Sequence, residues 1–164
     1  MSRKSVLHQT ESAFVGPVKA GIAGTVAGQL NVYCAHEVYV NQVLTTPYVI
    51  LKASNPQQFG YDSGIYEHDL EVAILTQADD ELTAATLNDI HHQRVEIIRD
   101  IMENFTALRL ALNAPAAPNP DKRTVTGGYT FSAIKYTGET QEFEERKMAT
   151  LLKYYVCAAP YDNI

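Results

Sequence analysis

Residues 83–112 read TAATLNDIHHQRVEIIRDIMENFTALRLAL, and this stretch decides how the rest of the chain is arranged. Apolar side chains and one arginine recur in it at steps of three and four, which is the spacing of one face of an α-helix. These residues are Leu87, Ile90, Arg94, Ile97, Ile98, Ile101, Met102, Phe105 and Leu108. The opposite side carries Asn88, Asp89, Gln93, Glu96, Asp100 and Glu103. Because a helix with one apolar stripe must bury that stripe, this helix requires a packing partner. The pattern weakens at residues 104–106, where a separate short helix can begin.

The partner is predicted to be a β-sheet, because the hydrophobic period changes from the helical to the strand value on both sides of the helix. The clearest strand is IYEHDLEVAILT at residues 65–76. One face of this strand, expected to meet the helices, carries Tyr66, His68, Leu70, Val72 and Ile74. The other face carries Glu67, Asp69, Glu71, Ala73 and Leu75. A second strand, YVILKAS at 48–54, follows Pro47, and turn residues predict a loop over 55–64.

Glycines interrupt the pattern in the N-terminal part of the chain. Residues 1–10 are polar and are expected to be flexible. A helix is predicted from about Pro17 to Gly28, because apolar residues step by four through Phe14, Val18, Ile22, Val26 and Leu30. The glycines among them oppose a helix, but they would let it approach a sheet or a neighbouring subunit closely. A short extended segment around Val38 and Val40 should follow.

The C-terminal part is predicted to be a long β-hairpin that follows a loop over residues 114–122. The first arm is expected at 124–137, the turn at Gly138-Glu139-Thr140 and the second arm at 142–159. One face of the second arm carries Met148, Thr150, Leu152, Tyr154 and Val156. Helices gathered on one face of a mostly antiparallel or mixed sheet form an α+β two-layer sandwich. Residues 1–164 are expected to form a single domain.

The composition narrows the functional classes. The 164 residues are 46% apolar and carry a formal net charge of −6, which favours a folded protein without non-specific affinity for DNA or anionic membranes. No apolar run approaches the roughly 18 residues that a membrane span needs. The start of the chain does not resemble a secretory signal, so Cys34 and Cys157 are expected to be free thiols in a reducing cytosol.

Motifs for metal or nucleotide binding are weak. Cys34 and His36 would hold zinc only if Cys157 or His68 lay beside them, and a buried thiol with an ordinary histidine is the simpler interpretation. The glycine-rich stretch 16–28 lacks the GKS/T ending of a phosphate-binding loop. No metal and no cofactor is therefore predicted.

Acidic residues offer the remaining catalytic hypothesis. The pairs at 79–80 and 144–145 could act as general acid and base, but helix capping and a solvated hairpin account for them as well. Glu67, Asp69 and Glu71 could form a divalent-metal cluster, yet alternate strand positions place their carboxylates about 7 Å apart. One ion cannot be held by all three without further ligands, so a solvated sheet face is preferred. No catalytic residue is predicted.

Four pieces of the sequence are informative together. They are the proline-led strand PYVI at 47–50, the strand-to-helix junction TQADD at 76–80, the helix end LALN at 110–113 and the closing strand YYVCAAP at 154–160. In the order helix, strands, long helix and hairpin, this layout resembles the tail-terminator, or tail-completion, family of long-tailed bacteriophages, which includes the lambda-like minor tail protein. The resemblance covers about residues 10–160.

The resemblance implies a structural virion protein of the tail or neck, without enzyme activity, that is assembled in the host cytoplasm. Such proteins form homohexameric rings that end polymerisation of the tail tube at its head-proximal end and then dock the head–tail connector. The implied partners are other copies of the chain, the tail tube protein and the connector or neck proteins, with no membrane partner. Genomic DNA would pass through the lumen without specific binding. A head-completion or connector-adaptor protein bound to the portal is the alternative.

Two sets of residues are candidate surfaces for this role. The acidic stripe of Glu67, Asp69 and Glu71 could line the lumen and repel DNA, or it could lie on the outer surface. The hairpin could extend the sheet into a neighbouring subunit or reach the tube, because free strand edges pair readily. Its candidate contact residues are Tyr129, Phe131, Lys135, Tyr136, Phe143, Arg146 and Lys147.

Overall fold

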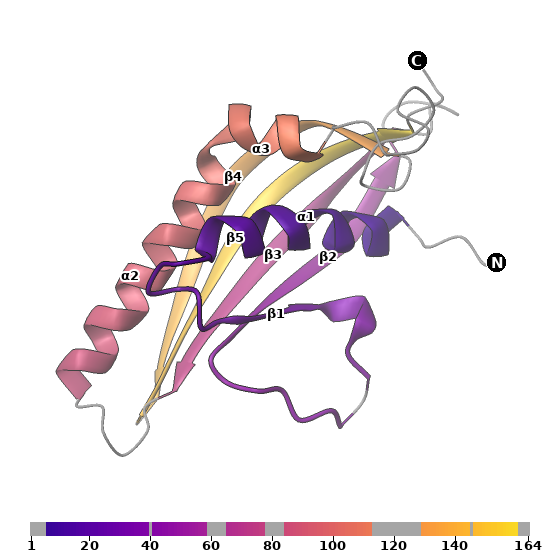
Figure 1. The fold of residues 1–164 in the computed structure, drawn as a ribbon. Helices are drawn as coiled ribbons and strands as arrows, with labels where there is room; N and C mark the ends of the chain where they lie inside the picture. Colours follow the sequence, from indigo (N-terminus) through magenta and orange to yellow (C-terminus); the bar gives the residue numbers. More distant parts are fainter. Residues whose placement is uncertain are drawn as a thin grey trace.

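The computed structural model describes residues 6–39, 41–58, 65–77, 84–112, 129–144 and 146–160. In chain order its elements are α1 (Val6–Ile22), β1 (Asn31–Cys34), the 3-10 turn η1 (Ala35–Glu37), β2 (Tyr48–Gln58), β3 (Tyr66–Gln77), α2 (Ala84–Glu103), α3 (Phe105–Leu112), β4 (Tyr129–Glu144) and β5 (Lys147–Pro160). Figure 1 shows α1 lying across the strands and α2 running lengthwise beside β4, with α3 at one end of the sheet. The order of helix, strands, long helix and hairpin is confirmed.

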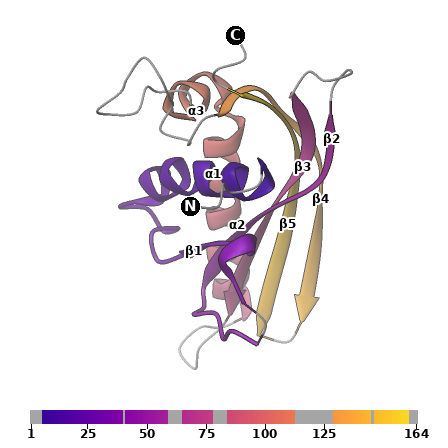
Figure 2. The ribbon, with the colours of Figure 1, turned by 90° about the vertical axis from the view of Figure 1, so that its right-hand side faces the viewer.

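The strands form one mixed sheet in the order β1-β2-β3-β5-β4. Strand β1 runs parallel to β2, and every other neighbouring pair is antiparallel. All three helices lie on the same side of the sheet (Figure 2). The predicted α+β two-layer sandwich is therefore confirmed. In β3 the burial alternates as predicted, with His68, Leu70, Val72 and Ile74 buried on the helix side.

The long helix follows its sequence pattern, including the break. Helix α2 ends at Glu103 and α3 begins at Phe105, so the predicted weak point falls at Asn104. Members of the predicted stripe that are buried are Leu87, Arg94, Ile98, Met102 and Leu108. His91 and Val95 are buried too, although the stripe did not include them. The buried face is wider than predicted: α2 packs against α1 as well as against β3 and β5, and His91 reaches Thr76 and Thr150 of the sheet.

The prediction for the first helix was wrong in both bounds. Helix α1 begins at Val6 instead of near Pro17, so residues 6–10 are helical instead of flexible, and it ends at Ile22, before Gly28. Pro17 lies inside the helix. An interior proline costs about 3 kcal/mol, and burial of Phe14 and Val18 in the core offsets that cost. Two residues past Ile22, Gly24 takes a φ of 74°, which ends the helix.

Two strand boundaries also differ from the prediction. The extended segment expected around Val38 lies earlier, as β1, because residues 31–34 pair in register with residues 48–51 of β2. Val40 lies outside the described residues. Strand β2 continues to Gln58 through a register irregularity between Ser54 and Gln57, so the first part of the predicted 55–64 loop is strand.

The predicted turn of the hairpin was wrong. Strand β4 runs to Glu144 and β5 begins at Lys147, so the chain reverses between these two residues, and Arg146 takes a φ of 69°. Gly138 lies within β4 at a register shift, with a φ of 152°. The glycine therefore serves a β-bulge instead of the turn. The predicted loop at 114–122 and the acid pair at 79–80 lie outside the described residues.

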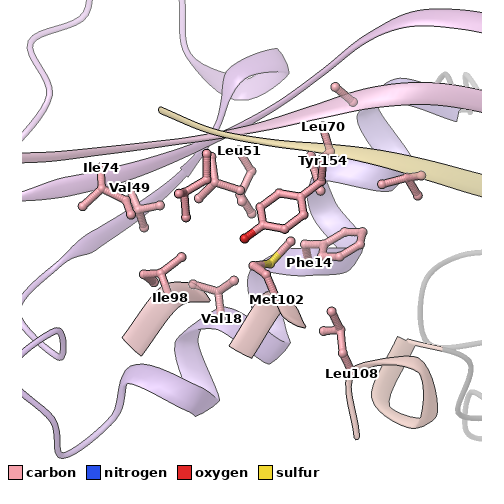
Figure 3. Close-up of a cluster of buried hydrophobic side chains, with 14 of the residues drawn as sticks. Phe14, Val18, Val49, Leu51, Leu70, Ile74, Ile98, Met102, Leu108 and Tyr154 are labelled. Carbon is pink, nitrogen blue, oxygen red and sulfur yellow. The ribbon is translucent and has the colours of Figure 1, made fainter. Parts of the chain in front are cut away.

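The core fills the space between the helices and the helix side of the sheet (Figure 3). Phe14 of α1 meets Phe131 of β4 edge to face, with ring centroids 5.6 Å apart. Figure 3 shows Met102, Tyr154 and Phe14 facing one another in this space. Further fully buried members are Val18, Val49, Leu51, Leu70, Val72, Ile98, Leu112, Leu152 and Val156.

The crossing of α1 and α2 depends on Gly21. A Cβ atom at this position would overlap Cγ1 and Cδ1 of Ile101. We expect Gly21→Ala to lower the free energy of unfolding by about 1–3 kcal/mol, because overpacking outweighs the helix propensity gained. Gly16→Ala is the matched control: no atom lies within 4 Å of its Cβ position, and a gain of about 0.5–1 kcal/mol is expected.

Urea unfolding of the two alanine variants measures this difference. In an Ile101→Ala background the penalty of Gly21→Ala should disappear, since the overlapping atoms are gone. Equal effects at the two glycines would show that α1 and α2 do not meet in this way.

Candidate functional site

The acidic stripe lies on the face of the sheet that the helices leave open. Glu67, Asp69 and Glu71 alternate with buried residues of β3, and all three are half-buried. The Tyr155 hydroxyl donates a hydrogen bond to Glu67 Oε2 at 2.5 Å, and this bond to a carboxylate raises the pKa of Tyr155 to about 12. Asn55 Nδ2 donates to Asp69 Oδ2 at 2.9 Å. The three acids therefore share one face, as predicted.

Lysines flank this stripe and reduce its net charge. Glu71 stands in register between Lys52 of β2 and Lys153 of β5, so one row of the open face reads lysine, glutamate, lysine. Neighbouring strands lie about 4.8 Å apart, which places these opposite charges within interaction range. The open face is a mixed-charge surface around Glu71, with its negative charge concentrated at Glu67 and Asp69.

The candidate contact residues of the hairpin fall into three groups. Phe131 is only 1% exposed and belongs to the core, so it is unavailable for contact in this fold. Lys135, Tyr136, Phe143, Arg146 and Lys147 are exposed. The side chain of Tyr129 lies outside the described residues, although its backbone begins β4.

The hypothetical zinc ligands do not come together. Cys34 is buried, whereas Cys157 pairs in register with Glu67 and so faces the open side of the sheet, away from His68. His36 Nδ1 lies 2.5 Å from Glu11 Oε2. Among the described residues, no group of three histidine, cysteine, aspartate or glutamate side chains is arranged to hold a metal ion.

A buried carboxylate that the sequence did not reveal ties three elements together. Glu11 of α1 is fully buried. Its Oε1 accepts a hydrogen bond from the backbone N–H of His36 at 2.8 Å, and its Oε2 accepts one from the backbone N–H of Ala53 at 2.8 Å. The His36 ring stacks on His8, with centroids 5.6 Å apart. Glu11 thus fixes η1 and β2 to α1, and no sequence signal separated it from an ordinary surface acid.

A second buried polar group lies between α2 and the sheet. His91 Nδ1 is 2.9 Å from Thr76 Oγ1, and its Nε2 is 2.8 Å from Thr150 Oγ1. Burial, with the nearby charges of His92 and Arg94, lowers the pKa of His91 to about 4. Arg94 donates to Thr76 Oγ1 at 3.2 Å and to the Val26 carbonyl at 3.2 Å. This group holds the turn after α1 against α2, which is a structural role.

In the described part of the chain, two hollows are open to solvent. The larger has a volume of about 380 Å³ and lies between the end of α1 and β1. It is lined by Lys19, Ile22, Ala23, Gly28, Leu30, Asn31, Val32 and Tyr33. The smaller, of about 190 Å³, lies on the open face of the sheet and is lined by Tyr48, Leu75, Glu142, Glu144, Lys147 and Ala149. Neither lining set pairs a serine, cysteine or threonine nucleophile with a histidine base.

No helix in the described part of the chain has the length and apolar character needed to cross a membrane.

No protein-family model and no curated protein matches this chain. A solved chain from the virion of a native gene transfer agent (GTA) particle is similar in structure, with a TM-score of 0.51 and 13% sequence identity. The similarity covers 93% of this chain and 94% of that chain, so the two share one fold over almost their whole lengths.

Proposed function

We propose that this protein is a structural component of a phage-type virion, and that it is the tail terminator, which forms a ring at the head-proximal end of the tail tube. The observation that supports this most is the fold shared with a chain of the gene transfer agent virion over 93% of this chain. The sequence resemblance to tail terminators is independent of that observation.

The proposed role is mechanical. A ring is built from a head-to-tail contact between two different surfaces, repeated until it closes. This chain has two different sheet borders, the short β1 and the long β4, and a free strand border readily takes another strand or loop. The ring would be a homohexamer, bound on one side to the last ring of the tail tube protein and on the other to the head–tail connector. Further tube subunits then have no surface to join.

Deleting the gene tests this role. The expected result is overlong tails without heads, because nothing stops tube polymerisation, and complementation should restore normal length. Tails of normal length beside filled heads that lack tails would contradict a terminator and favour the connector adaptor. Electron microscopy of lysates, with gold-labelled antibody against the chain, measures tail length and the position of the protein.

For the acidic stripe we propose a place facing the lumen, where negative charge keeps DNA from adhering. Replacing the acids by lysine would make the row of Lys52, residue 71 and Lys153 three lysines in register, so the amides are the cleaner change. We expect virions carrying Glu67→Gln, Asp69→Asn and Glu71→Gln together to assemble normally and eject DNA more slowly. The slowing should vanish at high salt, because salt screens these charges. Unchanged ejection at low salt would place the stripe elsewhere.

A further inference from the structure

Large apolar side chains are exposed at the two opposite borders of the sheet. On the β1 side, Tyr39 is 74% exposed and Val43 is 92% exposed, both in the segment between η1 and β2. On the other side, Phe143 of β4 is 69% exposed and Tyr136 is 37% exposed. Strands β1 and β4 are the two ends of the strand order. Exposed large apolar side chains at a sheet border make that border a candidate contact surface.

The segment on the β1 side is held in its exposed shape by hydrogen bonds. Gln42 Oε1 accepts from the Tyr39 N–H at 3.2 Å, and the Gln42 N–H donates to the Tyr39 carbonyl at 3.1 Å. Asn41, between them, takes a φ of 66°. Nearer the sheet, the Tyr33 hydroxyl accepts from the Thr45 N–H at 3.2 Å. Tyr39 and Val43 are thus presented by a preorganised turn, which lowers the entropy lost on binding.

The surface on the β4 side is on the helix side of the sheet, where α2 covers Tyr136 in part and leaves Phe143 exposed. Phe143 pairs in register with Met148, which is buried, so both side chains are on the helix side. Tyr136 packs edge to face on Tyr154, and the Arg99 guanidinium lies over the Tyr136 ring, 5.3 Å from its centre. Beside them runs the outer edge of β4, which pairs with no other strand of the described sheet. This surface offers apolar side chains and free backbone groups together.

Phe143 and the segment that carries Tyr39 and Val43 lie at the same end of the sheet, whereas Tyr136 lies further along β4, in register with Tyr154. Register places Tyr48, Leu75, Ala149 and Glu142 in one row across four strands, and Phe143 is next to that row. The segment that carries Tyr39 and Val43 leads directly into Tyr48, on the opposite side from α2 and β4 (Figure 1). When the two contacting surfaces lie at the same level along the strands, each added copy requires no translation in the strand direction. Such a contact favours a closed ring over a helical filament.

The charges of the two surfaces are compatible. The described residues of 38–47 include no lysine, arginine, aspartate or glutamate, so burying this segment removes no charge from water. On β4, Glu139 between Tyr136 and Phe143 is already paired with Arg99 at 3.3 Å. The contact can therefore be largely apolar without leaving an unpaired charge.

We infer that the partner of each surface is a second copy of this chain: the 38–47 segment of one copy packs on the Tyr136–Phe143 side of β4 in the next. This inference rests on the proposed ring and names the surfaces that close it. The contact is heterologous, so each copy uses both surfaces, one toward each neighbour.

Mixing two interface variants tests the inference. Val43→Asp and Phe143→Asp each place a carboxylate in one surface and leave the other intact. Each substitution alone should weaken self-association by roughly a hundredfold or more, so each variant protein should sediment as a monomer. The wild-type protein should form rings at high concentration. Mixed in equal amounts, they should form a one-to-one dimer, because the intact segment of Phe143→Asp meets the intact β4 of Val43→Asp. Leu110→Asp is the control: Leu110 is 71% exposed on α3, at the other end of the sheet.

Analytical ultracentrifugation with circular dichroism separates the outcomes. A dimer only in the mixture, with native spectra and an unaffected Leu110→Asp ring, supports the contact. Rings that persist in either single variant, or monomers that stay monomeric when mixed, overturn it, as does a wild type that remains monomeric. Rings that persist in a single variant, or variants that stay monomeric when mixed, would leave the proposed function intact. Tail lengths in the gene deletion test that function separately.

Discussion

Acidification from about pH 6.5 to about pH 4 is expected to destabilise this protein strongly, because two histidines are buried in their neutral form. Burial lowers the pKa of His68 to about 4, against the opposing charge of Asp69, and burial lowers that of His91 to the same value. Neither ring nitrogen of His68 has a hydrogen-bond partner among the described residues. The unfolded chain, with ordinary histidines near 6.5, binds more protons than the folded chain throughout this window.

The loss of unfolding free energy on acidification follows from that difference in proton binding. Above the unfolded pKa both states are neutral and the full stability is present. As the pH falls toward the folded pKa, protonation favours the unfolded chain, and each histidine removes at most roughly 3 kcal/mol. The loss is complete once the pH is below both values.

Urea unfolding at a series of pH values measures the effect. His68→Leu should remove about half of the histidine contribution and leave the protein at least as stable at neutral pH, because an unpartnered imidazole is replaced by an apolar side chain. His92→Gln is the control, since His92 is exposed, and its loss should change acid sensitivity only slightly, by removing its repulsion of His91. If the acid sensitivity of His68→Leu stayed as close to that of wild type as the acid sensitivity of His92→Gln does, His68 would not be buried in its neutral form.

Removing the Glu11 carboxylate is expected to cost about 3–5 kcal/mol of unfolding free energy, as for other buried charged partners. Glu11→Ala leaves the buried N–H of Ala53 and the partly buried N–H of His36 without their acceptor. Glu37→Ala is the matched control: Glu37 also contacts a histidine, His8 at 3.0 Å, but it lies at the surface and should contribute less than about 1 kcal/mol.

Hydrogen exchange locates this effect within the fold. In Glu11→Ala the amides of His36 and Ala53 should exchange faster than those in the middle of β3, because the carboxylate joins η1 and β2 to α1. A uniform increase over all strands would show that the variant unfolds globally instead. Similar unfolding free energies for Glu11→Ala and Glu37→Ala would show that Glu11 is not the clamp described.

The regular periodic segments were predictable from the sequence, and the places where tertiary contacts set the boundary were not. Strand β3 and helix α2 carry long unbroken patterns, so their burial follows from the sequence. The hairpin turn was misplaced because Gly138 is a strong turn signal, whereas the true reversal uses Arg146 at positive φ. A bulge glycine and a turn glycine look alike in a sequence.

The candidate site shows the same division. The common face of Glu67, Asp69 and Glu71 follows from strand alternation alone. Their lysine neighbours depend on strand order and register, which join residues far apart in the chain. The exposure of Val43 and Phe143 at opposite borders likewise depends on which strands end the sheet.

By itself, then, the sequence determined the two layers, the face that each periodic segment buries and the break at Asn104, because these depend on patterns within one element. Only the tertiary structure decided where α1 begins, which acid is buried and which borders stay free. Those outcomes depend on free energies of contact between distant segments: burial of Phe14 that outweighs an interior proline, and backbone N–H groups of η1 and β2 that satisfy Glu11.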